Sequence, residues 1–215
     1  MDKNIQIQIA KPFGRSIAKA NIPEEMITKL NDYVDNIIKD EKKSIAQNHG
    51  NKLAGQVTQE FILDRPFCET SGWMEFLGKC VSTWVEKSSG IPVKNFSLRD
   101  SWIVRQFKNE YNPIHWHSGH ISGAGFLKVP KTLGSHLQDK GDKKYSGGNL
   151  NLIHGSNMFL SRSMYEIKPE VGDFYFFPHY VMHTVYPFKG TEEERRSISF
   201  NATIDERIYD VYGKY

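Results

Sequence analysis

Between residues 96 and 204 the chain is a series of short runs typical of β-strands, separated by glycine, proline and asparagine. Short strands at this spacing predict a β-sandwich or a barrel. The aromatic fraction of 13% is high and suits a β-rich core with a deep pocket. The polar segment at residues 131–148 is predicted to be a loop or lid over the mouth of that pocket. We expect strands at residues 96–107, 121–129, 149–153, 164–168, 173–178, 184–187 and 195–204.

The part of the chain before residue 96 has a more helical character. Pro23 and the two glutamates after it predict a helix start, because proline is tolerated in the first turn and acidic side chains suit the helix dipole. A second helix is predicted at residues 72–87, where an aromatic stripe indicates packing in the core. Residues 39–52 are rich in lysine and asparagine and predict a solvated connection. Residues 5–9 alternate between apolar and polar, which predicts a short strand.

The length of the chain bounds its domain organisation. A chain of 215 residues is long enough for one sizeable domain with a single core. We therefore expect one domain over residues 1–215, with helical support at about 1–95, a β core at about 96–204 and a tail at 205–215. The tail could pack on its own domain or against a second copy, as in a homodimer.

Charge and cysteine content argue against several partners and compartments. A net charge of +3 gives no reason to expect a nucleic-acid or membrane partner. Two cysteines do not make a disulfide framework in a chain of this size, which favours a reducing compartment. The N-terminus lacks an apolar core of signal-peptide length, and no stretch approaches the roughly 20 apolar residues of a membrane span. We expect a soluble cytoplasmic protein.

Two histidines near the middle of the chain point to a metal site. His115 and His117 are two residues apart on a predicted strand, so both imidazoles would face one side while Trp116 faces the other. Convergent imidazoles suit iron, zinc, copper or nickel. His120 is close enough in sequence to be the ligand instead, and this alternative stays open at this point.

The C-terminal part adds a third histidine, His183, and then a basic strand. A strand with one polar face is usually exposed to solvent on that side, and a strand that lines a wet active-site cavity shows the same pattern. Arginine can bind a carboxylate in bidentate fashion, and a serine two residues later can add a hydroxyl on the same side. Alternation along the strand at 195–204 predicts that its polar face carries Arg195, Ser197, Ser199 and Asn201.

An ordered set of short motifs extends over roughly half of the chain, from about residue 102 to residue 204. The set comprises Trp102, Asn112-Pro-Ile-His115-Trp-His117, Ile121-Ser-Gly123, Gly147-Gly148-Asn-Leu150, Gly172-Asp-Phe-Tyr-Phe-Phe-Pro178, His183, and Arg195-x-Ser197 with Phe200-Asn201. In this order the motifs resemble the iron(II)- and 2-oxoglutarate-dependent oxygenases. The resemblance is closest to a bacterial and phage branch distantly related to prolyl hydroxylases.

The resemblance implies a mainly β fold with flanking helices, the cupin-like jelly roll or double-stranded β-helix. It implies that Fe(II) is held by His115, His117 and His183. It also implies that 2-oxoglutarate is the cosubstrate, with its far carboxylate on Arg195 and Ser197, and that O2 is consumed. The implied reaction is hydroxylation of a small-molecule or peptide substrate with release of succinate and CO2. No catalytic residue beyond the metal centre is implied.

Two positions depart from the family's pattern. His117 stands where the family usually has Asp or Glu, so the third ligand would be a neutral imidazole. Prolyl-hydroxylase relatives often have a tyrosine that touches the cosubstrate, whereas this chain has Ser122-Gly-Ala-Gly125-Phe126 in that region. Candidates to close the pocket instead are Lys128, Arg105 and Asn151.

Two other classes of protein share part of this pattern. A cupin-type metalloprotein can have a three-histidine site without using 2-oxoglutarate, but it does not require Arg195 with Ser197. A non-catalytic jelly-roll binding protein that has lost its metal would also explain a histidine in place of the carboxylate. The ordered set as a whole favours the oxygenase.

Overall fold

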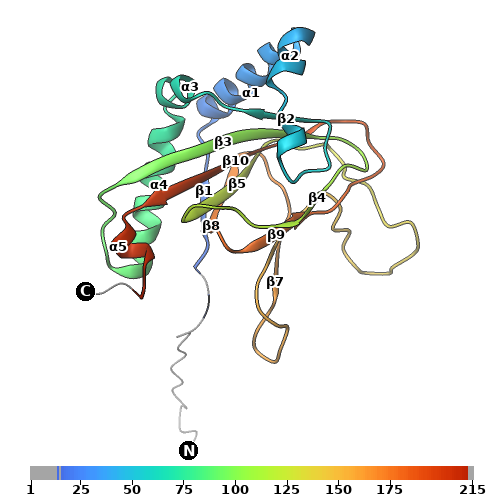
Figure 1. Ribbon diagram of the computed structural model, residues 1–215. Coiled ribbons are helices and arrows are strands. Elements are labelled where there is room, and N and C mark those ends of the chain that lie inside the picture. Colours follow the sequence, from blue (N-terminus) through green and yellow to red (C-terminus); the bar gives the residue numbers. More distant parts are fainter. Residues whose placement is uncertain (1–13, 15, 213–215) are drawn as a thin grey trace, which may run out of the picture.

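The computed structural model describes residue 14 and residues 16–212, and the strand predicted at residues 5–9 lies outside them. Two antiparallel sheets form a sandwich (Figure 1), which confirms the predicted fold class. In spatial order, the larger sheet consists of β1 (Ala18–Asn21), β8 (Asp173–Pro178), β5 (Ile121–Lys128), β10 (Arg195–Ile204), β3 (Phe96–Gln106) and β2 (Gln59–Ile62). The smaller sheet consists of β4 (Asn112–His115), β9 (Met182–Val185), β6 (Leu150–Ile153) and β7 (Met164–Ile167).

Two strand boundaries differ from the prediction in ways that affect the histidines. The strand predicted at 184–187 is β9 at Met182–Val185, so His183 lies inside it. His115 and His117 were expected on one strand, but β4 ends at His115. The reason is that the pairing of β4 with β9 ends where His115 lies opposite His183, so His117 follows in irregular chain.

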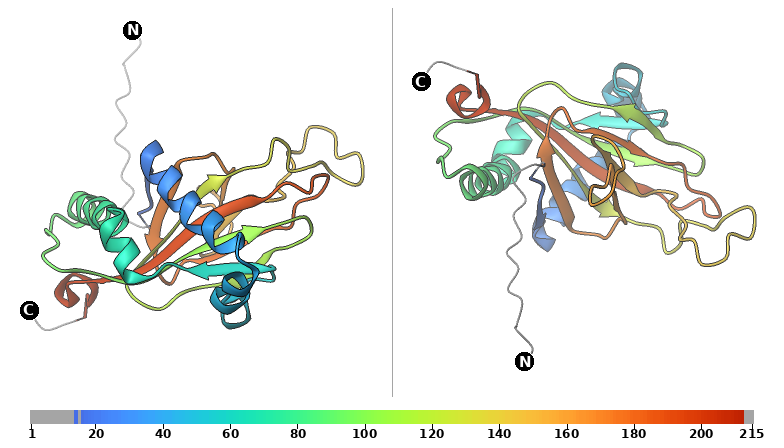
Figure 2. Two further views of the ribbon diagram at one scale, coloured as in Figure 1. Left: turned by 90° about the horizontal axis from the view of Figure 1, so that it is seen from above. Right: turned by 90° about the horizontal axis from the view of Figure 1, so that it is seen from below.

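Helices cover the outer face of the larger sheet, with α1 and α4 lying across it (Figure 2). The helical segments are α1 (Glu24–Ile38), α2 (Glu41–Gln47), the 3-10 helix η1 (Gly50–Lys52), α3 (Arg65–Thr70), α4 (Trp73–Ser89) and α5 (Glu206–Tyr209). None of the helices in the described part of the chain combines the length and the apolar character that a membrane span requires.

Both predicted helices are confirmed. α1 begins after Pro23, and its apolar stripe buries Leu30, Val34 and Ile37. α4 lies between Gly72 and Gly90, whose φ angles of +83° and +74° are left-handed. Glycine ends a helix easily in this way because it has no Cβ to clash with the backbone.

The connection predicted at residues 39–52 is partly helical. The side chain of Asp40 accepts a hydrogen bond from the backbone N–H of Lys43 at 3.2 Å and so caps α2. All of α2 except Ser44 is exposed, so the segment is solvated as predicted. β1, β2 and α3 were not predicted, because four to six residues are too few for a hydrophobic period to be recognised.

Two apolar cores lie on the two sides of the larger sheet. On the helix side, Trp73 of α4 packs edge-on against Phe174 of β8 with ring centroids 5.5 Å apart, and its indole N–H donates to Ser101 Oγ at 2.9 Å. The aromatic stripe of α4 is therefore core, as predicted. Between the two sheets, a smaller core consists of Phe126, Leu150, Leu152, Ile167, Tyr175, Phe177, Val181 and Val185.

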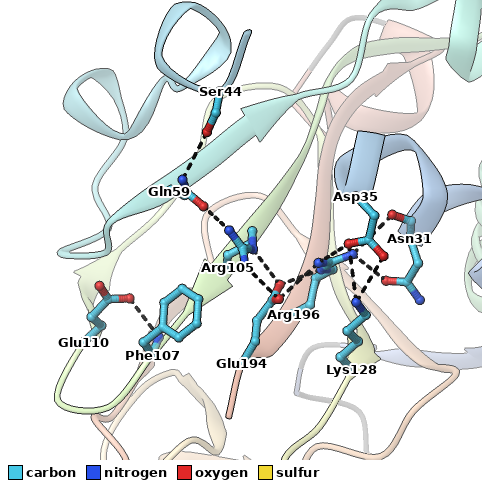
Figure 3. A network of polar contacts seen from close by, with 10 residues as sticks. All are labelled: Asn31, Asp35, Ser44, Gln59, Arg105, Phe107, Glu110, Lys128, Glu194 and Arg196. Atoms are coloured by element: carbon cyan, nitrogen blue, oxygen red, sulfur yellow. Dashed lines mark hydrogen bonds and ion pairs between the residues drawn. The ribbon is translucent and has the colours of Figure 1, made fainter. Parts of the chain in front are cut away.

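A buried polar network on the helix side joins α1 to the larger sheet (Figure 3). Arg196 of β10 donates from Nη2 to Asp35 of α1 at 2.7 Å and from Nε to Glu194 at 2.6 Å. Glu194 also pairs with Arg105 of β3, which donates to Gln59 of β2. The network thus ties three strands and a helix together on the face opposite the inter-sheet cavity.

Candidate metal centre

A cavity of about 360 Å³ lies between the two sheets at one end of the smaller core. This volume is within the usual range for ligand sites, about 300–1,000 Å³. The inner face of β10 contributes Arg195, Ser197, Ser199 and Asn201 to its lining, which confirms the predicted alternation along that strand. The smaller sheet contributes His115 and His183.

Three histidines converge in this cavity. Their ring nitrogens lie within 4.8 Å of one another. His115, at the end of β4, is opposite His183 on β9, and His117 reaches the same point from just beyond β4. The Nε2 atoms of His117 and His183 are 3.1 Å apart. Two strands and the irregular segment after one of them therefore position all three imidazoles.

Backbone carbonyls orient two of the rings. The Nδ1 of His115 bonds the carbonyl of Pro113 at 2.7 Å, and the Nδ1 of His183 bonds the carbonyl of Val181 at 3.0 Å. A carbonyl can only accept, so Nδ1 carries the proton in both rings and Nε2 keeps its lone pair. This is the arrangement by which proteins orient metal-binding histidines.

Burial keeps the three imidazoles neutral. It lowers the pKa of His117 to about 3 and, with the adjacent ring of His115, the pKa of His183 to about 4. It also lowers the pKa of His115. Metal ions bind the deprotonated ring, so these histidines are in the metal-binding form at neutral pH.

The donor set fits a divalent metal ion. Imidazole suits Fe, Zn, Cu and Ni, and a metal–nitrogen bond of about 2.1 Å would place two ligands at a right angle about 3.0 Å apart. The 3.1 Å separation of the His117 and His183 nitrogens agrees with that value. Within the described residues no Asp or Glu belongs to the cluster, so the set is three histidines and not two histidines with a carboxylate.

The same cavity contains a buried guanidinium group that has no acidic partner within residues 16–212. Arg195 is 1% exposed, and burial lowers its pKa to about 10, so it stays charged at neutral pH. Its Nε donates to the carbonyl of Gly148 at 3.0 Å, and its Nη1 donates to Gln106 Oε1 at 3.1 Å and to Ser197 Oγ at 3.4 Å. Among the described residues, Nη2 has no hydrogen-bond partner. A buried charge in this state favours an anionic ligand.

Several residues that were alternative candidates for the metal site or the pocket lie elsewhere. His120 accepts a hydrogen bond from the backbone N–H of Ile204 and stacks on the ring of Tyr209, outside the histidine cluster. Lys128 and Arg105 form ion pairs on the helix side of the larger sheet. Asn151 is buried but does not line the cavity, so none of these three candidates closes it.

The wall of the cavity also differs from the prediction. Residues 131–148 form a loop, as predicted, but no residue of this segment lines the cavity, so it is not the lid that was the other possibility. Residues 52–55, together with Glu60 and Ile62 of β2, line the cavity instead. Gln106, which orients Arg195, was missed although alternation along β3 from Trp102 would have placed it on the inner face.

Comparisons with known proteins agree with this geometry. A family profile described as "Putative 2OG-Fe(II) oxygenase" matches residues 100–201. A search among curated proteins found no match. The structure resembles a Pseudomonas putida prolyl-4-hydroxylase at 12% identity and a TM-score of 0.57, with 87% of this chain and 92% of that chain covered.

Two further solved structures share the fold. A Trichoplax adhaerens prolyl hydroxylase, solved with a hypoxia inducible factor peptide fragment, is 14% identical with a TM-score of 0.54 and coverage of 92% and 87%. HygX from Streptomyces hygroscopicus, solved with nickel, 2-oxoglutarate and hygromycin B, is 11% identical with a TM-score of 0.56 and coverage of 87% and 82%. Residues 100–201, which include the three histidines and Arg195, therefore match the 2-oxoglutarate- and Fe(II)-dependent oxygenase family, and the chain shares the double-stranded β-helix fold of these solved structures.

Proposed function

We propose that this oxygenase holds Fe(II) through His115, His117 and His183, and that it binds the far carboxylate of 2-oxoglutarate through Arg195 with Ser197 beside it. The family match over residues 100–201 implies Fe(II) and 2-oxoglutarate as cofactor and cosubstrate. When bound, these groups and O2 would supply the oxidising chemistry, with succinate and CO2 as coproducts and a hydroxylated substrate.

One observation carries the assignment of residues. A charged, buried guanidinium group with a free Nη2 lies in the same cavity as three convergent neutral imidazoles. A 2-oxo diacid carries a chelating end and a distant carboxylate, so it can satisfy both features with one molecule. Gly148 and Gln106 hold the guanidinium in place before the ligand arrives, which lowers the entropic cost of binding.

We propose that the substrate is a small molecule or a peptide. HygX was solved with hygromycin B and the Trichoplax adhaerens enzyme with a peptide fragment, so relatives with this fold accept both kinds of ligand. We also propose that residues 1–215 act as one domain. In support of this, one apolar core contains residues from Ile22 to Ile204 and joins helices and sheet. A homodimer formed through the C-terminal segment stays a prediction.

Succinate formation tests the proposal directly. Purified protein supplied with Fe(II) and 2-oxoglutarate should release succinate in a manner that requires both additions. Arg195→Gln should lose this activity, whereas Arg162→Gln, at an exposed position away from the cavity, should keep it. A protein that binds metal but never turns over or binds 2-oxoglutarate would contradict the proposal and favour the cupin-type metalloprotein.

A further inference from the structure

Glu60 is a buried acidic residue of the cavity that neither the metal centre nor Arg195 uses. It is 2% exposed, on the short edge strand β2. Its Oε2 is inaccessible to solvent and lacks a hydrogen-bond partner, and within the described residues its side chain forms no ion pair. A buried carboxyl group without a partner is costly, so its presence in a ligand cavity indicates a function.

Strand pairing places Glu60 on the same inner face as the proposed cosubstrate site. Glu60 lies opposite Val104 of β3, and Val104 lies opposite Ser197 of β10. Residues opposite each other in a sheet share a face, and neighbouring strands are about 4.8 Å apart. Glu60 is therefore about 10 Å across the sheet from Ser197, by this spacing. Its neighbour Phe61 points the other way, into the helix-side core.

A second unpaired acceptor lies beside Glu60. The Oδ1 of Asn112, at the start of β4, is also buried without a partner. A Cβ atom on Gly55 would lie 2.6 Å from Asn112 Oδ1 and 2.9 Å from Glu60 Oε1, so both oxygens converge over this glycine. Only a residue without a side chain leaves that space open.

The missing partner of these oxygens should be a positively charged donor. Burial raises the pKa of Glu60 to about 7, in agreement with the lack of a hydrogen-bond partner for its buried Oε2 within the described residues. Apart from the histidines, the cationic residues that line the cavity are Lys52 and Arg195, and neither pairs with Glu60. A neutral donor would leave the carboxylate charge buried, whereas an ammonium or guanidinium group would neutralise it and could donate to both oxygens.

We propose that Glu60, with Asn112 beside it, binds a positively charged nitrogen of the substrate and so determines that the substrate class is cationic. The ammonium or guanidinium group of a small molecule or of a lysine or arginine side chain would fit this pair. The inference deepens the proposed function, because Glu60 would orient the substrate relative to the three histidines. Glu60 is thus a substrate-binding residue outside the metal centre.

Matched pairs of probes test the proposal by calorimetry under oxygen-free conditions, with metal-loaded protein and 2-oxoglutarate present. The pairs are Nα-acetyl-arginine amide with Nα-acetyl-citrulline amide, and Nα-acetyl-lysine amide with Nα-acetyl-norleucine amide. Within at least one pair the wild type should bind the cationic member about ten-fold more tightly or better, as expected for a hydrogen-bonded charge. Glu60→Gln should abolish the preference and leave the Kd for 2-oxoglutarate unchanged.

A control variant and a second measurement complete the test. Glu75→Gln, on the exposed face of α4 where Glu75 pairs with Lys79, should keep the wild-type preference. If Glu60 instead had a structural partner, Glu60→Gln would lower the Tm. We expect a Tm no lower than that of the wild type. A fall in Tm, or a wild type without preference for either cationic probe, would overturn the proposal.

The design separates this proposal from the proposed function. Probe binding is read by calorimetry and does not require turnover. Failure of the protein to bind metal or 2-oxoglutarate would contradict the proposed function, and repeating the titration in the absence of both would still report on Glu60. A preference for cationic probes that persists in Glu60→Gln would overturn the role of Glu60 while leaving the metal centre intact.

Discussion

Arg195 and Arg196 are adjacent in β10, but their guanidinium groups lie on opposite faces of the larger sheet in opposite electrostatic surroundings. Arg196 is fully buried and forms ion pairs with Asp35 and Glu194 (Figure 3). Arg195 is almost as buried and has no acidic partner among the described residues. The strand therefore separates a structural arginine from one that is available to a ligand.

The first prediction concerns Arg195. Arg195→Gln should raise the Kd for 2-oxoglutarate by roughly 10-fold to 100-fold, because a hydrogen bond to a charged group contributes about 1.5–3 kcal/mol. The Tm should change little, since the variant removes a buried charge that has hydrogen-bond partners but no acidic partner among the described residues. Calorimetry and thermal unfolding of the same preparation measure both quantities. An unchanged Kd would argue against Arg195 as the carboxylate anchor.

The second prediction is the reverse for Arg196. Arg196→Gln should lower the free energy of unfolding by about 3 kcal/mol, because Glu194 and Asp35 lose their buried cation and keep only Arg105 and Lys128. We expect the lower end of the usual range, since the Asp35 side chain is 34% exposed. Urea unfolding measures the loss. The folded fraction should bind 2-oxoglutarate normally, and a defect in binding without a loss of stability would contradict the assignment.

The third prediction concerns the metal ligands. His183→Ala should lower metal affinity by more than about 100-fold, because even the loss of a residue that orients a ligand typically costs 10–100-fold. His120→Ala is the control, since His120 lies outside the cluster. His117→Asp should keep metal binding, because a carboxylate is an equally good ligand for iron. Metal titration of the three variants gives the result, and equal loss in His120→Ala would contradict the ligand set.

Titration of Glu60 gives the fourth prediction. The pKa of Glu60 is raised from 4.5 to about 7 by burial, so the folded protein binds this proton more tightly than the unfolded chain. Its stabilising contribution is therefore fully present below about pH 4.5 and is lost as the pH rises through about 7. Glu60→Gln should gain stability relative to the wild type as the pH rises across this window. Urea unfolding at several pH values measures the difference in unfolding free energy between Glu60→Gln and the wild type. If the pKa of Glu60 were not raised, this difference would stay constant across the window.

The residues of the site that could be predicted from the sequence are those carried by local patterns. The spacing of His115 and His117 predicted convergent rings, and alternation predicted that Arg195 and Ser197 share a face. Both patterns need only the geometry of an extended chain. The position of His115 opposite His183, by contrast, depends on which strands become neighbours in the sheet.

The residues that could not be predicted depend on long-range pairing. β2 has only four residues, so an alternation of apolar and polar residues cannot be recognised in its sequence. Glu60 reaches the cavity only because β2 pairs with β3. The possibility of a lid at 131–148 could not be judged from the sequence, because polarity and glycine content identify a loop without saying where it lies. The same limit explains why residues 52–55, at and just beyond the end of the connection predicted at residues 39–52, were not recognised as a cavity wall.

The central claim is that three histidines and Arg195 form one site for iron and 2-oxoglutarate. The most direct test is a calorimetric titration of 2-oxoglutarate into Fe(II)-loaded protein in the absence of oxygen. We predict saturable binding at a single site that requires the metal and is lost in His183→Ala. Binding of equal strength with and without Fe(II), or no binding to protein that holds iron, would contradict the account.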